Sequence, residues 1–347
     1  MVTNERPGVY SSIEVSSGLN GALRSKTVGI AGVSDIGEKG ICKHIASYGE
    51  AVSAFGAGCG LTKLIRILLM NGAFSIKAVP AAVGTAAETK DYEAAFSVLM
   101  DEECVSVMLC DSADAEVHKA MRQAIAGANE NCKYRIGVVQ VQGDAAAAAA
   151  AAKTINCERI VMVYPKNAGA EAPCAEAAAF AGLISTGGDP ALPVNGAELF
   201  GLEGAAGAFS DADITLLVQA GVTPVETLGG KACAVRGLTT RTTTAGAEDN
   251  TWRELTTVLV VDDVIPSVRN ALRARFPRVK NTAQTRGAIR TQVLLELENK
   301  LKQEIIDSYG AVSAQALAGD PCTCEVSFEF AVAHGLNRIN LSAHISV

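Results

Sequence analysis

The chain has 347 residues, of which 49% are hydrophobic and only 19% charged, and its formal net charge is −7. This length allows two or three domains with a large core, and the low charge content indicates that much of the surface contacts other molecules. The acidic net charge gives no support for a general nucleic-acid binder. No apolar run approaches the roughly 20 residues that span a bilayer. The first residues also lack the regions of a signal peptide, so we expect synthesis in the cytoplasm.

The first two dozen residues predict an extended arm. They contain a Pro-Gly turn in "ERPGVY" and then a short alternating stretch without helical periodicity, with apolar positions at Val9, Ile13 and Val15. After the arm, residues 26–37 supply an apolar run with glycine turns. Residues 60–73 predict a helix that ends at an Asn-Gly pair.

Residues 105–187 alternate between strands and helices. Strands rich in Val and Ile that alternate with helices pair in parallel through right-handed crossovers, so this region predicts an α/β layer structure. Eight alanines, Ala145 to Ala152, have the highest helix propensity and would let their helix approach a neighbour closely. The predicted strands are 105–110, 134–141 and 159–165, and the predicted helices are 113–128, 144–154 and 172–185.

The order of elements changes after a polar loop over 241–250, and the elements that follow this loop indicate a second, α+β domain. A helix capped by Ser210 and a hairpin around Gly229 and Gly230 come before the loop. The remaining prediction is a strand over 252–263, helices over 265–276 and 282–306, and a strand over 325–333 with Val326, Phe328, Phe330 and Val332 on one face.

The sequence contains no clear catalytic or cofactor motif. The stretch "FGAGCGLTK" resembles a phosphate-binding loop, but Lys63 lies three residues beyond Gly60, so a glycine turn before a helix explains it better. The dinucleotide fingerprint G-x-G-x-x-G is absent after the first strand of the α/β region. We therefore predict no cofactor and no enzymatic activity.

The aspartates, cysteines and histidines that could act in catalysis or metal binding are better explained by structural roles. Asp262 and Asp263 stand directly before a predicted helix, where carboxylates cap backbone amides, and capping is favoured over a metal or an acid–base pair. Cys322 and Cys324 form a single C-x-C pair, which is a weak zinc signal. The four histidines, His44, His118, His334 and His344, lie in no nucleophile motif.

One charge feature exceeds the background. No acidic residue occurs between Val264 and Leu295, although the whole chain is acidic. A solvated helical face and a surface that attracts an acidic partner explain this stretch equally well. Its basic residues are Arg269, Arg273, Arg275, Arg278, Lys280, Arg286 and Arg290.

The last residues have the pattern of a half-buried strand. Apolar and polar side chains alternate from Ile339 to Val347, with Leu341 and Ile345 on the apolar side. An unpaired apolar edge strand promotes aggregation, so the strand needs a partner. From the residues alone, a hairpin with 326–332 through "HGLN" is favoured over a strand given to another copy.

Several segments together resemble the contractile tail sheath proteins of phages and of phage-tail-like bacteriocins. They are "ERPGVYSSIEV", "AAAFAGLIS" followed by "ALPVNGAEL", "AGVTPVETLGGKACAVRGLTT", "TVLVVDDVIPSVRNALRARF" and the terminal strand. The resemblance extends from end to end, and it depends on the order of these segments. This chain is compact, without room for the large insertions of bigger members.

The resemblance implies a structural subunit that polymerises as stacked hexameric rings around an inner tube and contracts to drive the tube through a target cell envelope. It implies an N-terminal arm (1–24), an α/β sheath domain (25–240), a C-terminal α+β domain that faces the tube (248–335) and a C-terminal strand arm (336–347). Other sheath subunits, the tube, the baseplate and the tail terminator would be partners, without nucleic acid or membrane insertion. Assembly into a phage tail or tail-like particle released on lysis would follow synthesis in the bacterial cytoplasm.

Under this hypothesis the arms pair with neighbouring subunits, which would answer the question of the terminal strand's partner. Arm residues would be Val9, Ile13, Val15, Ile339, Leu341, Ile345 and Val347, with hinges at Gly18, Gly21 and Gly335. The tube-facing candidates are Arg269, Arg273, Arg275, Lys280, Arg286 and Arg290. The alternative is a soluble doubly wound α/β enzyme or small-ligand-binding protein with its site at the carboxyl ends of the middle strands.

Overall fold

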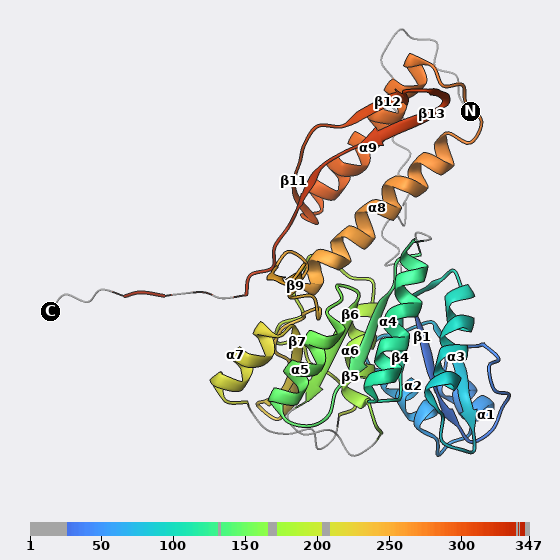
Figure 1. Cartoon of the computed structure of the whole chain (residues 1–347), viewed down its shortest axis with the longest axis vertical. Coiled ribbons are helices and arrows are strands. Elements are labelled where there is room, and N and C mark those ends of the chain that lie inside the picture. Colours follow the sequence, from blue (N-terminus) through green and yellow to red (C-terminus); the bar gives the residue numbers. More distant parts are fainter. Residues whose placement is uncertain are drawn as a thin grey trace, which may run out of the picture.

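The computed structural model describes residues 26–130, 133–165, 172–202, 209–337, 339 and 341–343. Its larger part is an eight-stranded sheet with the strand order β2-β3-β1-β4-β5-β6-β7-β8 (Figure 1). The six inner strands are parallel, and only the short edge strands β2 and β8 are antiparallel to their neighbours. The strands are β1 (Thr27–Ser34), β2 (Lys43–Ile45), β3 (Ile76–Val83), β4 (Val105–Cys110), β5 (Ile136–Gln140), β6 (Ile160–Pro165), β7 (Val222–Leu228) and β8 (Lys231–Ala234).

Helices cover both faces of this sheet. One face packs against α1 (Tyr48–Phe55), α2 (Gly60–Met70) and α6 (Ala175–Ser185) in a core that includes Phe55 and Phe180. The second core includes Phe96, Met121 and Leu217 on the other face. Its helices are α3 (Thr89–Asp101), α4 (Ala115–Glu130), α5 (Ala145–Ile155) and α7 (Asp211–Gln219). The predicted α/β layer structure is confirmed.

Local sequence signals explain several of these elements. The side chain of Asp144 caps α5, and the small side chains of Ala148 and Ala152 are fully buried against the sheet layer. Ser210 caps α7 as predicted, because its hydroxyl accepts a hydrogen bond from the Asp213 amide. The hairpin between β7 and β8 turns at two glycines with positive φ, which is the backbone conformation that tight hairpin turns require.

The rest of the described chain forms a smaller helical unit that projects from the sheet (Figure 1). A long helix, α8 (Leu255–Arg275), connects it to the sheet, and α9 (Ala283–Lys302) packs along α8. Two small antiparallel sheets complete the unit, and its core includes Val260, Val293 and Ile306. They pair β11 (Ile306–Tyr309) with β14 (Phe330–Val332) and β12 (Ser313–Leu317) with β13 (Asp320–Ser327), and a short hairpin of β9 (Thr243–Thr244) and β10 (Ala247–Glu248) precedes α8.

The predicted strand over 252–263 is wrong, because α8 begins at Leu255 and continues without interruption to Arg275. The segment is rich in Thr and Val, which favour strands, yet Val260 and Val264 lie four residues apart and are buried on one helix face. Asp262 and Asp263 therefore stand inside the helix, and their predicted capping role is wrong as well.

The predicted strand over 325–333 is two strands in the structure. The strand conformation is interrupted between Ser327 and Phe330, and the two parts belong to different sheets. The four apolar side chains assigned to one face of it still pack on the core of the helical unit. Across the described ranges, no helix is long and apolar enough to cross a membrane.

Candidate functional surfaces

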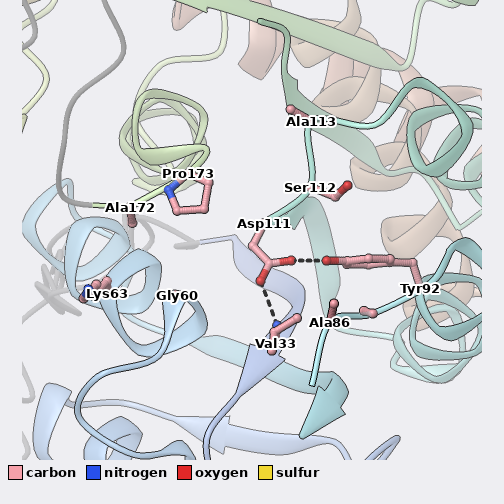
Figure 2. Close-up of a pocket in the computed structure, with 11 residues that line it drawn as sticks. Val33, Gly60, Lys63, Ala86, Tyr92, Asp111, Ser112, Ala113, Ala172 and Pro173 are labelled. Carbon is pink, nitrogen blue, oxygen red and sulfur yellow. Dashed lines mark hydrogen bonds between the residues drawn. The ribbon is translucent and has the colours of Figure 1, made fainter. Parts of the chain in front are cut away.

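The sheet has a crevice where the order of its strands reverses. β3 pairs with β1 on one side and β4 pairs with β1 on the other, so the crevice lies beyond the carboxyl ends of β1 and β4. Its volume is about 490 Å³, and Val33, Tyr92 and Asp111 line its centre (Figure 2). This position is the one where doubly wound α/β proteins bind ligands, so it is where the alternative prediction would place an active site.

The polar groups at the centre of the crevice bind one another. The Tyr92 hydroxyl donates to Asp111 Oδ1 at 2.5 Å, and the Val33 amide donates to Asp111 Oδ2 at 2.7 Å (Figure 2). Burial raises the pKa of Asp111, whereas these two hydrogen bonds oppose the increase. β1 is irregular between Gly32 and Val33, and a Cβ on Gly32 would lie 2.8 Å from Asp111 Oδ2. Asp111 thus ties the irregular end of β1 to α3, which is a structural role.

The other chemical candidates of the sequence do not converge on this crevice. Cys59 caps α2, because its Sγ accepts a hydrogen bond from the Thr62 amide, so the glycine-rich stretch is the turn before a helix. His118 is buried, and its Nε2 lies 3.0 Å from the Ser112 carbonyl oxygen. Because a carbonyl only accepts, His118 donates there, and burial lowers its pKa. Within the described ranges no group of three His, Cys, Asp or Glu side chains could hold a metal ion.

The two aspartates of α8 join the helical unit to the sheet. Arg159, just before β6, donates to both Asp262 oxygens at 2.6 and 2.5 Å, and both side chains are nearly buried. Asp263 pairs with Lys300 of α9. Burial lowers the pKa of the Lys26 ammonium, and the charges of both aspartates oppose this. Sequence analysis missed this cluster, because Arg159 and Asp262 lie 103 positions apart.

The basic stretch contains two groups in the structure, which share Arg275. Four of the six tube-facing candidates hydrogen bond within the chain: Arg269 with Tyr134, Arg275 with Gln292, Arg286 with Asn281, and Arg290 with the Val312 carbonyl. Arg273, Arg275, Arg278 and Lys280 are exposed around the end of α8 and the loop before α9. We call these four residues the basic tip.

The described part of the C-terminal arm does not pair with its own chain. β13 pairs with β12 and β14 pairs with β11, and none of the described arm residues pairs with the free edge of either sheet, so the hairpin between 326–332 and the terminal strand does not form in the described residues. Asn195 donates to Asn337, and Gly335 lies so close to Pro193 that a Cβ would be 2.8 Å from it. Beyond this point Ile339 is 77% and Leu341 91% exposed.

Residues 1–25, which include Val9, Ile13, Val15, Gly18 and Gly21, lie outside the described residues, as do Ile345 and Val347.

Comparisons with known proteins agree along most of the chain. The family model of the phage tail sheath protein central domain matches residues 85–240, and that of the phage tail sheath C-terminal domain matches residues 247–346. No match was found among curated protein sequences.

Solved structures share the fold at low sequence identity. The anti-feeding prophage (AFP) helical sheath in its contracted state is 15% identical with a TM-score of 0.72, covering 99% of this chain and 100% of that one. The sheath tail protein of Desulfitobacterium hafniense is 10% identical with a TM-score of 0.72, covering 94% of this chain and 100% of that one. The sheath tail protein of Listeria innocua is 10% identical with a TM-score of 0.70, covering 89% and 96%.

The doubly wound sheet with a projecting helical unit is thus the fold of tail sheath subunits. The chain belongs to the phage tail sheath protein family, and it is a subunit of a contractile tail sheath. The alternative of a soluble α/β enzyme or ligand-binding protein is not favoured.

Proposed function

We propose that the subunit polymerises as stacked hexameric rings around an inner tube and contracts to drive that tube through a cell envelope. The observation on which this proposal depends most is the C-terminal arm, because Ile339 and Leu341 expose apolar side chains that a soluble monomer would cover. A head-to-tail contact that does not close produces a helical filament, as a sheath requires.

The two arms add strands to neighbouring subunits in this proposal. Residues Ile339 to Val347, and Val9 to Val15 at the other end, pair with another copy, because main-chain hydrogen bonds give affinity and alternating side chains fix the register. Gly335 is the proposed joint of the C-terminal arm, and its close approach to Pro193, where a Cβ would be 2.8 Å away, anchors the arm on the subunit at this point. Gly18 and Gly21 are the matching joints of the N-terminal arm.

The helical unit faces the tube through the basic tip. The exposed guanidinium and ammonium groups of Arg273, Arg278 and Lys280 support this, because they present unbalanced positive charge at the far end of a long helix. Arg286 and Arg290 have partners inside the chain, so they position the tip. Charge reversal at Arg273 and Lys280 should weaken tube binding, and unchanged tube binding would remove the tip from the interface.

Further partners and the site of assembly follow from the same proposal. Structures that share the fold include those of the AFP baseplate in two states, which supports contacts of the terminal ring with a baseplate. A tail-terminator protein would cap the other end. We infer a purely structural role in a phage tail or tail-like particle, assembled in the bacterial cytoplasm and released on lysis.

The test is electron microscopy of the purified full chain and of a chain ended before Ile339. Hollow tubes formed by the full chain and lost on truncation would support polymerisation and strand donation together. A matched control replaces Leu228, which is 50% exposed at the opposite end of the sheet, with Ser and should leave the tubes intact. Tubes that survive truncation would refute strand donation by this arm.

A further inference from the structure

An exposed apolar patch lies at the amino end of the sheet, apart from the arms and the basic tip. It consists of Met70, Phe74 and Phe200, which are 47%, 69% and 50% exposed. Phe74 is the most exposed aromatic side chain of the described sheet and its helices. Large apolar side chains gathered in this way on a soluble surface mark a place that another segment covers.

Hydrogen bonds hold Phe200 at the end of α2, although the two lie far apart in the sequence. Asn71 donates from Nδ2 to the Phe200 carbonyl at 2.9 Å, and the Phe200 amide donates to Asn71 Oδ1 at 2.9 Å. Met70 lies beside the next residue, since its sulfur is 3.1 Å from where a Cβ of Gly201 would stand. Met70 and Phe200 are therefore fixed beside each other, and Phe74 follows Met70 by four residues, just before β3.

The chain enters the described structure beside this patch. The amide of Lys26 donates to the Ser185 carbonyl at 2.8 Å, and the amide of Val28 donates to the Ser75 carbonyl at 3.0 Å. Ser185 ends α6, and Ser75 follows Phe74 directly. The Lys26 hydrogen bond thus holds the base of the N-terminal arm over the carboxyl ends of α6 and α2, where the patch lies.

We propose that residues 18–25 of the same chain cover the patch, with Leu19 and Leu23 on Met70, Phe74 and Phe200. This segment, "GLNGALRS", contains two leucines four positions apart directly before the anchored Lys26. At about 3.3–3.6 Å per extended residue, both leucines are within reach of a surface that begins at the anchor. Because the leucines belong to the same chain as the patch, their effective concentration at the patch is in the millimolar range. A second copy in dilute solution does not reach this concentration.

The consequence is a divided N-terminal arm. Its base, which includes Gly21, is fixed on the subunit that owns it, so Gly18 remains as the joint and only the residues before it are free to reach a neighbour. This inference does not depend on the proposed polymer, because it concerns a contact inside one subunit.

Acrylamide quenching of a tryptophan placed in the arm tests this proposal on unassembled full-length subunits. The variant L23W in a W252F background puts the only tryptophan at the proposed contact, and I13W in the same background puts it in the free part of the arm. We expect the quenching constant to be several-fold lower for position 23 than for position 13. Adding F74S and F200S should raise the constant at position 23 to that of position 13, without a loss of helical circular dichroism.

The matched control is L228S, because Leu228 is as exposed as Phe200 and lies at the opposite end of the sheet. It should leave the quenching constant at position 23 unchanged. Equal quenching at positions 13 and 23 would overturn the proposal. Protection of position 23 that increases with protein concentration would also overturn it, since the cover would then come from a second copy.

Discussion

Breaking the Arg159–Asp262 ion pair should weaken the attachment of α8 to the sheet, because it leaves an unpaired buried charge. In Arg159→Met, the Asp262 carboxylate loses two contacts of 2.6 and 2.5 Å while its side chain remains 11% exposed. Removing one partner of a buried ion pair costs about 3–5 kcal/mol. The Lys26 charge acts on the same carboxylate, so we expect the lower end of this range, about 3 kcal/mol.

Trp252 provides the assay. It is the single tryptophan of the chain, it lies three residues before α8, and it packs on the core of the sheet. Urea unfolding of unassembled subunits, followed by its fluorescence, therefore reports the release of α8. The unfolding midpoint of Arg159→Met should move to a lower urea concentration, which corresponds to a loss of about 3 kcal/mol in the free energy of unfolding.

Two control variants make this prediction specific. R159M/D262L removes both charges, and it should recover most of the loss because no unpaired buried carboxylate remains. Lys119→Met breaks an exposed pair with Glu116 and should cost less than about 0.5 kcal/mol. A loss below about 1 kcal/mol in Arg159→Met, or an additive double variant, would refute the reasoning.

Two further predictions concern the sheet. Burial lowers the pKa of His118 in the folded state, so its contribution to stability is present above about pH 6.5 and is lost as the pH falls through the lowered value. His118→Gln should therefore flatten the dependence of the unfolding free energy on pH between 7.5 and 5.5, and an unchanged slope would contradict this. Gly221→Ala should cost roughly 3 kcal/mol or more, because φ is +75° and a Cβ would lie 2.4 Å from the Thr239 carbonyl oxygen. Gly229→Ala has φ of +58° and no atom within 4 Å of its Cβ, so it should cost only about 1–2 kcal/mol. Thermal unfolding of both variants measures the two losses, and equal losses would contradict the steric argument.

The α/β layer could be predicted from sequence because its signals are local. Each middle strand is a short run of Val and Ile between helices, and Asp144 and Ser210 announce helix starts within three residues of the amides that they cap. The pairing of β1 with β3 could not be predicted in the same way. It depends on contacts such as Val28 with Ile76, across two helices and a short strand.

The start of α8 was misread for a physical reason. Its residues from Leu255 to Val264 are mostly β-branched or apolar, so propensity favours a strand and the burial of almost every position hides the helical period. Packing of Leu255 and Val258 on the core of the sheet and packing of α8 against α9 decide the helix. The role of Asp262 was missed for the related reason that its partner lies in another element and gives no signal at close spacing.

The terminal strand shows what a single chain cannot specify. The alternation of apolar and polar residues from Ile339 onward indicates which side chains are buried on pairing. The partner of the strand depends instead on where an unpaired sheet edge is available. In the described residues β14 pairs only with β11, and each strand of this two-stranded sheet keeps one unpaired edge, yet the described part of the arm pairs with neither edge. Leu341 is 91% exposed, so its apolar area is in contact with water in the single subunit. Under the proposed strand donation a neighbouring subunit would bury this area, and the free energy of that burial would favour polymerisation.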